Sequence, residues 1–170
     1  MAKYIFSVYS ERTRLMAESI VGEKEIIYVS GDQDILGVIR DCIDSEETNV
    51  ILMDVNEDEN LNNAIRINDQ FRYMSTLKIY CCAISTLSEH IIDHMNEENR
   101  KVHLKPAVIR RIYPARSEVL DFLANHSLLK EACTIRGEKW INIAVIGLGV
   151  YGMEFFRHVL WCAQDRKSVV

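Results

Sequence analysis

The sequence predicts a doubly wound α/β fold, in which helices cover both faces of a mostly parallel β-sheet. Short runs rich in β-branched and aromatic residues alternate along the chain with longer amphipathic runs. The alternation occurs six times, as expected for parallel strands joined by helical crossovers. The run at 49–55 is apolar nearly throughout, which is typical of a strand covered on both faces.

The predicted strands are recognised by their β-branched, aromatic or continuously apolar residues. They lie at residues 3–10, 24–31, 49–55, 77–85, 106–114 and 138–147. The fifth is bounded by Pro106 and Pro114, and the sixth reads "EKWINIAVIG".

The predicted helices place apolar residues at spacings of three and four, which gathers them on one face. They lie at residues 11–22, 32–47, 57–74, 88–98, 117–132 and 150–164. Gly22 is expected to end the first helix, while Asp32 and Ser88 are suited to cap the starts of the second and fourth.

Length, charge and cysteine content exclude several classes of protein. A chain of 170 residues is about the size of one domain. Its net charge of -5 argues against sequence-independent binding to nucleic acid or to an anionic membrane surface. It has neither an apolar run long enough to cross a bilayer nor the apolar core of a signal peptide. The five cysteines have no paired spacing, so we expect reduced thiols in a cytoplasmic protein.

A glycine-rich turn near the end of the chain is the strongest motif. Gly147, Gly149 and Gly152 fit G-x-G-x-x-G between a predicted strand and a predicted helix, the context of a dinucleotide-binding site. The first glycine permits the tight turn, the second the approach of a pyrophosphate, and the third close packing of helix and strand. The cofactor expected there is NAD(H) or an adenine nucleotide. The further strand and ribose-binding acid that complete such a site are absent from the sequence given.

Two interpretations of this turn remain open: it closes the sheet as a sixth strand, or it starts a second dinucleotide-binding domain. The turn after the first predicted strand, residues 7–13, contains no glycine, and a Cβ at each position hinders a pyrophosphate. Ser10 is therefore expected to cap the first helix; the alternative is that Ser7, Ser10 and Arg12 hold a small anion.

A family resemblance rests on the segment Asp58-Glu59-Asn60-Leu61, with Gly31-Asp32 and Leu36 upstream and "IYPARSEVLDFLANHSLL" downstream. Together these resemble the Rossmann-like TrkA-N domain, of the class that regulates potassium conductance (RCK). The resemblance covers Tyr4 to Leu129, and a second copy would begin at Ile141. It implies that Asp58 and Asn60 line the ligand crevice; Asp58 as a helix cap is the favoured alternative.

The expected organisation is a TrkA-N-like domain at 1–131, a linker at 132–140, and at 141–170 either a sixth strand and helix or the first unit of a second domain. The expected function is a non-catalytic regulatory domain that senses a nucleotide or transmits a signal, with a link to the control of ion transport. The alternatives are a fragment of an NAD(P)-dependent oxidoreductase with its cofactor at 147–152, and a ligand-free dimerisation module.

The histidines offer no arrangement for catalysis. His90 and His94 have the spacing of a two-histidine metal face, but no third ligand is evident, so no metal site is expected. The last helix carries the apolar run "FFRHVLW". We therefore expect a homodimer or an exchange of the C-terminal segment between chains, and a second domain in a longer native chain.

Overall fold

The computed structural model of the chain describes residues 1–31, 33–43, 47–128, 130 and 143–164. The chain forms two compact units, Met1–Ile112 and Tyr113–Val170. The linker predicted at 132–140 lies outside the described residues. The division between the units comes earlier, so the helix predicted to close the first domain belongs to the second unit.

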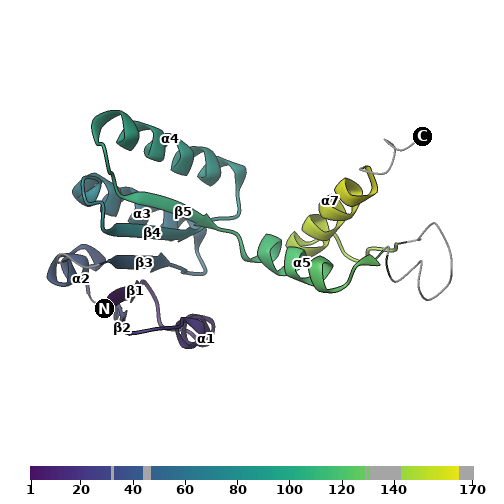
Figure 1. Cartoon of the computed structure of the whole chain (residues 1–170), viewed down its shortest axis with the longest axis horizontal. Coiled ribbons are helices and arrows are strands. Elements are labelled where there is room, and N and C mark those ends of the chain that lie inside the picture. Colours follow the sequence, from purple (N-terminus) through teal and green to yellow (C-terminus); the bar gives the residue numbers. More distant parts are fainter. Residues whose placement is uncertain (32, 44–46, 129, 131–142, 165–170) are drawn as a thin grey trace. The chain divides into compact units, whose positions relative to one another are not determined.

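The first unit contains a five-stranded parallel sheet (Figure 1). Its strands are β1 (Ala2–Phe6), β2 (Lys24–Tyr28), β3 (Thr48–Leu52), β4 (Leu77–Cys82) and β5 (Val108–Ile112), in the order β2-β1-β3-β4-β5. Every neighbouring pair is parallel. The predicted doubly wound, Rossmann-like α/β class is therefore confirmed. All five residues of the central strand β3 are buried, as its apolar sequence predicts.

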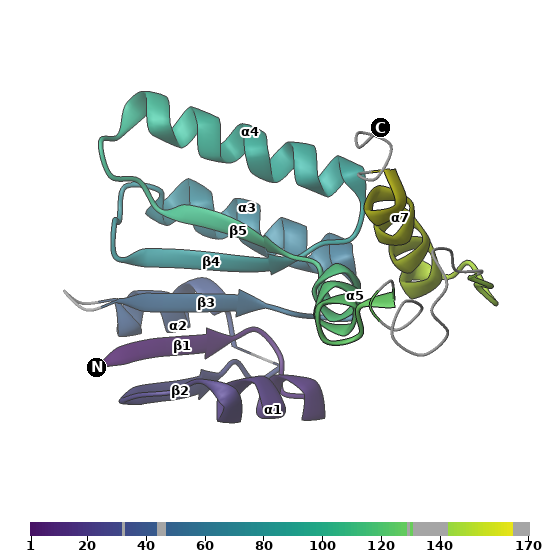
Figure 2. The same ribbon diagram turned by 45° about the vertical axis from the view of Figure 1, so that its right-hand side comes forward.

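Helices cover both faces of this sheet (Figure 2). The helix α1 (Glu11–Ser19) lies on one face. The helices α2 (Ile35–Cys42), α3 (Glu57–Phe71) and α4 (Thr86–Val102) lie on the other. Parallel crossovers are right-handed, so a helix changes face when the strand order reverses direction. The chain runs from β1 outward to β2 and then back past β1 to β3, so the switch point lies between β1 and β3.

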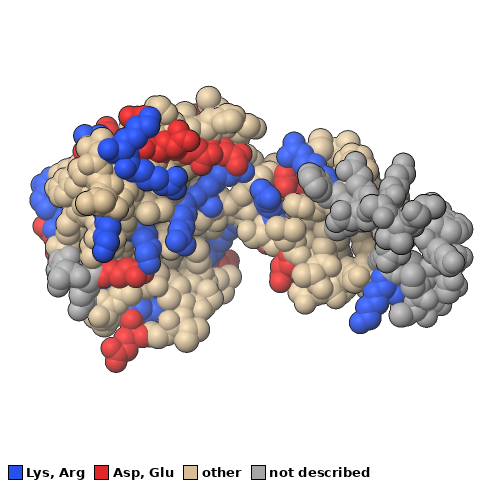
Figure 3. Space-filling view, turned by 45° about the horizontal axis from the view of Figure 1, so that its top comes forward, with Lys and Arg blue, Asp and Glu red and all other residues tan. Residues whose placement is uncertain are grey.

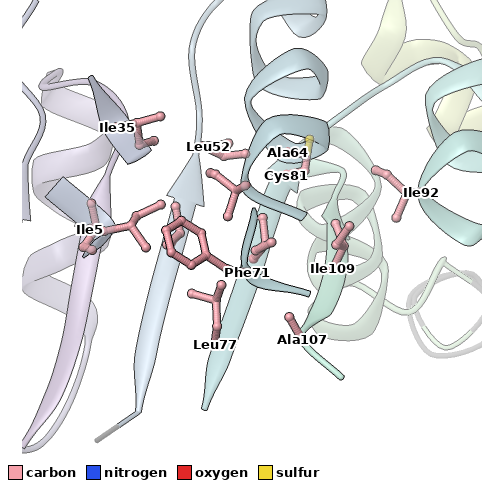
Figure 4. Close-up of a cluster of buried hydrophobic side chains, with 14 of the residues drawn as sticks. Ile5, Ile35, Leu52, Ala64, Phe71, Leu77, Cys81, Ile92, Ala107 and Ile109 are labelled. Carbon is pink, nitrogen blue, oxygen red and sulfur yellow. The ribbon is translucent and has the colours of Figure 1, made fainter. Parts of the chain in front are cut away.

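The larger core lies between the sheet and the helices α2, α3 and α4 (Figure 4). Ile5, Leu52 and Ile109 reach it from the strands, and Phe71 and Ile92 from α3 and α4. A smaller cluster around Phe6, Ala17 and Ile51 packs α1 on the opposite face. Every residue of both clusters lies within the first unit, so the burial of apolar surface that stabilises the sheet is internal to it.

Helix starts differ from the predicted caps by two or three residues. The cap of α2 is Asp34, whereas Asp32 lies outside the described residues. The cap of α4 is Ser85, so the prediction of Ser88 was wrong. In α3 the capping side chain is that of Asn56, and Asp58 sits in the first turn. The prediction that Asp58 caps this helix was therefore wrong as well.

The second unit contains the helices α5 (Pro114–Asn125) and α7 (Val150–Gln164). Phe122 and Phe155 meet edge to face, with ring centroids 6.1 Å apart. Glu154 is buried, and its carboxylate accepts hydrogen bonds from Tyr113 Oη at 3.2 Å and from Arg157 at 2.9 Å. The strand predicted at 138–147 falls partly outside the described residues, and its described part from 143 onwards has no strand conformation.

Candidate functional site

A cavity of about 480 Å³ lies at the carboxyl ends of β1, β2 and β3. Parallel α/β sheets bind ligands in the crevice outside these strand ends, where the strand order reverses. The volume falls within the range of about 300–1,000 Å³ that is usual for small-molecule sites. Ser7, Val8 and Tyr9 line it after β1, and Asp54 after β3. After β2 it is lined by Val29, Ser30, Gly31, Gln33, Asp34 and Ile35, and from α3 by Asn63 and Arg66.

The wall after β1 is held by hydrogen bonds internal to the turn. The Ser10 hydroxyl accepts from the Thr13 amide at 3.2 Å, and the Ser10 amide donates to Thr13 Oγ1 at 2.9 Å. This reciprocal pair caps α1, which confirms the favoured interpretation of Ser10. The Ser7 hydroxyl accepts from the Met53 amide at 3.1 Å and so joins the ends of β1 and β3.

The wall between α2 and α3 contains the only cation among the described residues of the lining, Arg66. Its guanidinium donates to Asp34 Oδ1 at 2.9 Å and to Asn63 Oδ1 at 3.3 Å. About half of each charged side chain is exposed, 51% for Arg66 and 56% for Asp34, so solvent weakens the ion pair. The pair fixes the two side chains at the rim of the cavity without removing their hydrogen-bonding capacity.

The wall after β3 depends on Asn60, which is 1% exposed. Its amide oxygen accepts from the Asp54 amide at 2.8 Å, and its nitrogen donates to the carbonyl oxygens of Asp54 at 2.9 Å and Cys82 at 3.1 Å. Asp54 Oδ1 in turn accepts from the Asn56 amide at 2.9 Å. Asn60 thus joins the loops that follow β3 and β4 and positions Asp54 at the cavity.

Of the first-unit residues considered as ligand groups, Ser7 of the alternative anion site lines the cavity, whereas Ser10, Arg12, Asp58 and Asn60 do not. Ser10 is engaged as a cap, Asn60 is buried against backbone groups, and Asp58 is exposed on α3. The lining residues Tyr9, Asp34, Asp54, Asn63 and Arg66 were not predicted. Tyr9 and Asp54 stand near the carboxyl ends of the predicted strands 3–10 and 49–55, and Asp34 stands in the first turn of the predicted helix 32–47. The rule that ligands bind at carboxyl strand ends therefore points to these three residues.

The glycine turn lies in the second unit, and two of its three glycines have the geometry that the motif requires. Gly147 has φ +89°, a conformation that side chains other than glycine's disfavour. An added Cβ at Gly152 would overlap the carbonyl oxygen of Gly147. At Gly149 an added Cβ would meet no atom within 4 Å. The helix α7 begins directly after this open position.

The cysteine and histidine side chains form no metal centre in the described part of the chain. Cys81 is buried and Cys82 half-buried, as expected of adjacent residues that point to opposite faces of a strand. His90 and His94 are exposed on α4. Among the described residues, no group of three or more His, Cys, Asp and Glu side chains is placed to hold a metal ion.

Acidic and basic side chains lie beside one another on the face of the first unit shown in Figure 3. Lys101 pairs with Glu98 at 2.6 Å on α4, and Arg111 of β5 pairs with Glu89 at 2.5 Å. In each of these pairs a carboxylate neutralises the charge of its basic neighbour. Over the residues that the structure describes, no helix is long and apolar enough to cross a bilayer.

Comparison of the chain with protein-family models, with curated proteins and with solved structures finds no match in any of the three. The fold and the cavity therefore define the class of protein: a Rossmann-like α/β domain with a crevice at the carboxyl ends of its strands.

Proposed function

We propose that this chain is a non-catalytic, cytoplasmic regulatory domain of the TrkA-N/RCK kind, which senses a nucleotide-type ligand in the crevice of its first unit. The observation that carries this proposal is the position of the cavity, at the point of a parallel sheet where the strand order reverses. Ligand binding there would order the loops after β1, β2 and β3 together. Control of ion transport is the regulated process that the family resemblance implies.

The chemistry of the lining supports a role in binding rather than catalysis. Two carboxylates of the lining are engaged, Asp34 by Arg66 and Asp54 by the Asn56 amide, and among the described lining residues no histidine stands beside a serine hydroxyl to activate it. Its polar groups are hydroxyls, amides, two carboxylates and one guanidinium, several of which are hydrogen-bonded to neighbouring groups. Such groups suit recognition of a polar ligand.

Titration calorimetry of the full chain against adenosine, AMP, ATP, NAD and NADH tests the proposal. Ser30 is exposed and lines the cavity, so Ser30→Trp should fill part of it and weaken binding at least tenfold. Ser75→Trp, at an exposed site just before β4, is the matched control and should bind as the unmodified chain does. A ligand that binds only the folded chain also raises its melting temperature. Equal affinity in the two tryptophan variants would contradict the proposal.

The second candidate function, a fragment of an NAD(P)-dependent oxidoreductase, is favoured by the conformation of the glycine turn. The positive φ of Gly147 and the close approach at Gly152 are what a dinucleotide-binding turn requires. Gly149→Asp would place a carboxylate where the pyrophosphate approaches. NAD binding that is lost in Gly149→Asp and retained in Ser30→Trp would favour this candidate over the crevice.

The third candidate, a ligand-free dimerisation module, is favoured by exposed apolar side chains on α5 and α7 of the second unit. Leu120 and Phe122 of α5 and Tyr151, Phe156 and Leu160 of α7 are each more than two-fifths exposed. The partner that we propose is a second copy of this chain, packed through α7 or by exchange of the C-terminal segment. Light scattering coupled to gel filtration tests this: Phe156→Glu should shift a dimer to a monomer, whereas a wild-type monomer at high concentration would contradict it.

A further inference from the structure

The crevice differs chemically from a site for a dinucleotide at the turn after β1. Where a helix start binds phosphate, its backbone amides point at the ligand. Here the amides of Ser10 and Thr13 are both engaged in the capping pair, and Thr13 is fully buried. Thr13 Oγ1 also donates to the Val8 carbonyl at 3.1 Å. A phosphate could reach the amides of Ser10 and Thr13 only by displacing these hydrogen bonds.

The charges of the lining also disfavour a phosphate. The described lining has two carboxylates, Asp34 and Asp54, and a single guanidinium, Arg66. Arg66 is paired with Asp34 at 2.9 Å, which leaves the charge of Asp54 uncompensated within the lining. A doubly charged phosphate would therefore be repelled, because like charges near a protein surface cost free energy when they approach. A carboxylate is well suited, however, to accept hydrogen bonds from the hydroxyls of a sugar.

An aromatic side chain forms part of the same wall. Tyr9 lines the cavity and is 64% exposed. Its ring meets Tyr28 edge to face, with centroids 5.0 Å apart, and Tyr28 stacks on Phe6 at 5.4 Å. This row supports the Tyr9 ring from the core, so the ring can contact a planar ligand with little loss of its own freedom. A planar ring is therefore a natural partner for this wall.

We infer that the crevice takes an uncharged nucleoside, that is, a planar base joined to a sugar, and discriminates against its phosphorylated forms. The inference rests on the proposed function in one respect, namely that the crevice is a ligand site. Tyr9 supplies the surface for the base, and Asp54 accepts from the sugar hydroxyls. The capped start of α1 and the negative charge of the lining provide the discrimination against phosphate.

Calorimetric titration of the full chain with adenosine and with AMP tests this inference. Adenosine should bind at least tenfold more tightly than AMP at low salt, and the ratio should shrink as salt screens the repulsion. Tyr9→Ala should weaken adenosine binding about tenfold. Tyr9→Phe keeps the ring and should bind adenosine as the unmodified chain does. Asp54→Asn keeps an acceptor for the Asn56 amide but removes the negative charge. The affinity for AMP should therefore move closer to the affinity for adenosine. Arg100→Ala, at an exposed site on α4, is the control.

The results separate this inference from the proposed function. If AMP or NAD binds more tightly than adenosine and Ser30→Trp abolishes that binding, the crevice is a ligand site but the inferred class of ligand is wrong. If neither adenosine nor any phosphorylated form binds at millimolar concentration, both are overturned. Equal adenosine affinity in Tyr9→Ala and wild type, with circular dichroism showing both folded, would also overturn the inference.

Discussion

Asn60 shows how a residue that resembles a ligand-binding group can serve the scaffold instead. Its buried amide makes three hydrogen bonds to backbone groups of Asp54 and Cys82. Asn60→Ala would leave these buried groups without partners, which typically costs about 1–3 kcal/mol for each unsatisfied group. We expect the free energy of unfolding to fall by about 2–4 kcal/mol in urea titrations, near the upper range for single substitutions.

The exposed neighbour Asn62 provides the control for Asn60. Because Asn62 is exposed on the same helix, Asn62→Ala should change the free energy of unfolding by no more than about 0.5 kcal/mol. If Asn60→Ala leaves stability unchanged but weakens nucleotide binding, Asn60 contacts the ligand as the family resemblance implies. The scaffold role would then be wrong.

The thiol of Cys81 should be unreactive in the folded chain. The pKa of Cys81 is raised from 9.0 to about 12. Burial is the largest cause, and the nearby Cys82 and Glu57 raise the pKa further. At pH 8 its thiolate fraction is therefore about a thousandfold lower than in the unfolded chain. Iodoacetamide labelling followed by site-resolved mass spectrometry should modify Cys81 only after unfolding in urea. Rapid labelling of Cys81 without urea would show that β4 opens readily.

At the scale of elements, Glu57 joins the starts of two helices. From the first turn of α3 its carboxylate accepts hydrogen bonds from the amide and hydroxyl of Ser85, at 3.0 and 2.7 Å, and from the hydroxyl of Ser88. Burial raises the pKa of Glu57, but the hydrogen bonds from Ser88 and Ser85 outweigh it, so the pKa lies below the usual 4.5. The stabilisation is therefore present above pH 4.5 and is lost as the pH falls through the lower, folded-state pKa.

Glu57→Gln should accordingly destabilise the chain at pH 7, by about 1 kcal/mol for a partly exposed charged acceptor. The difference from wild type should shrink as the pH falls below 4.5, because the wild-type carboxyl is then protonated too. Thermal melts between pH 3 and pH 7 measure it. Glu59→Gln, in the same turn but exposed, is the matched control. A difference that does not change with pH would exclude the charged carboxylate as its source.

The glycine turn before α7 makes a second prediction for an element. Because a Cβ at Gly152 would overlap the Gly147 carbonyl oxygen, Gly152→Ala must move the turn relative to the helix. Overpacking of this kind costs about 1–3 kcal/mol. Hydrogen exchange monitored by mass spectrometry should show faster exchange of the α7 amides in this variant. Gly149→Ala, whose Cβ meets open space, should have a much smaller effect; equal effects would show that the turn is not closely packed.

Local sequence patterns predicted the types of these elements better than their ends. The strand and helix periodicities are visible in residues that are neighbours in the chain, so β1 to β5 were all found. A cap also depends on backbone conformation: Asn56 and Ser85 have extended φ and ψ angles, and their side chains accept the capping hydrogen bonds. Several nearby Asp, Asn or Ser residues can fulfil the chemical requirement, and the sequence does not distinguish them.

At the scale of the whole molecule, the sequence predicted the class of fold but not the composition of the crevice. Tyr9, Asp34 and Asp54 are far apart in the chain and meet only because β1 lies between β2 and β3. Strand order depends on pairing between distant segments, which local patterns do not contain. The segment from 143 likewise has an apolar, strand-like sequence but no strand in its described part. A strand forms only where a neighbour pairs with its backbone groups, and local sequence does not specify that neighbour.

The distribution of core residues predicts that the first unit folds by itself. Both hydrophobic clusters and all five strands lie within Met1–Ile112, so a fragment of these residues keeps the buried apolar surface of the sheet. It should show a cooperative thermal transition by circular dichroism.

A fragment of residues 1–104 should not show this transition, because it lacks β5 and with it the core residues Ala107 and Ile109 and the backbone partners of β4. Losing these contacts should cost several kcal/mol, comparable with the total stability of about 5–15 kcal/mol of a typical domain. If the longer fragment is unfolded as well, the sheet needs the second unit for its stability, and the two units form one cooperative domain.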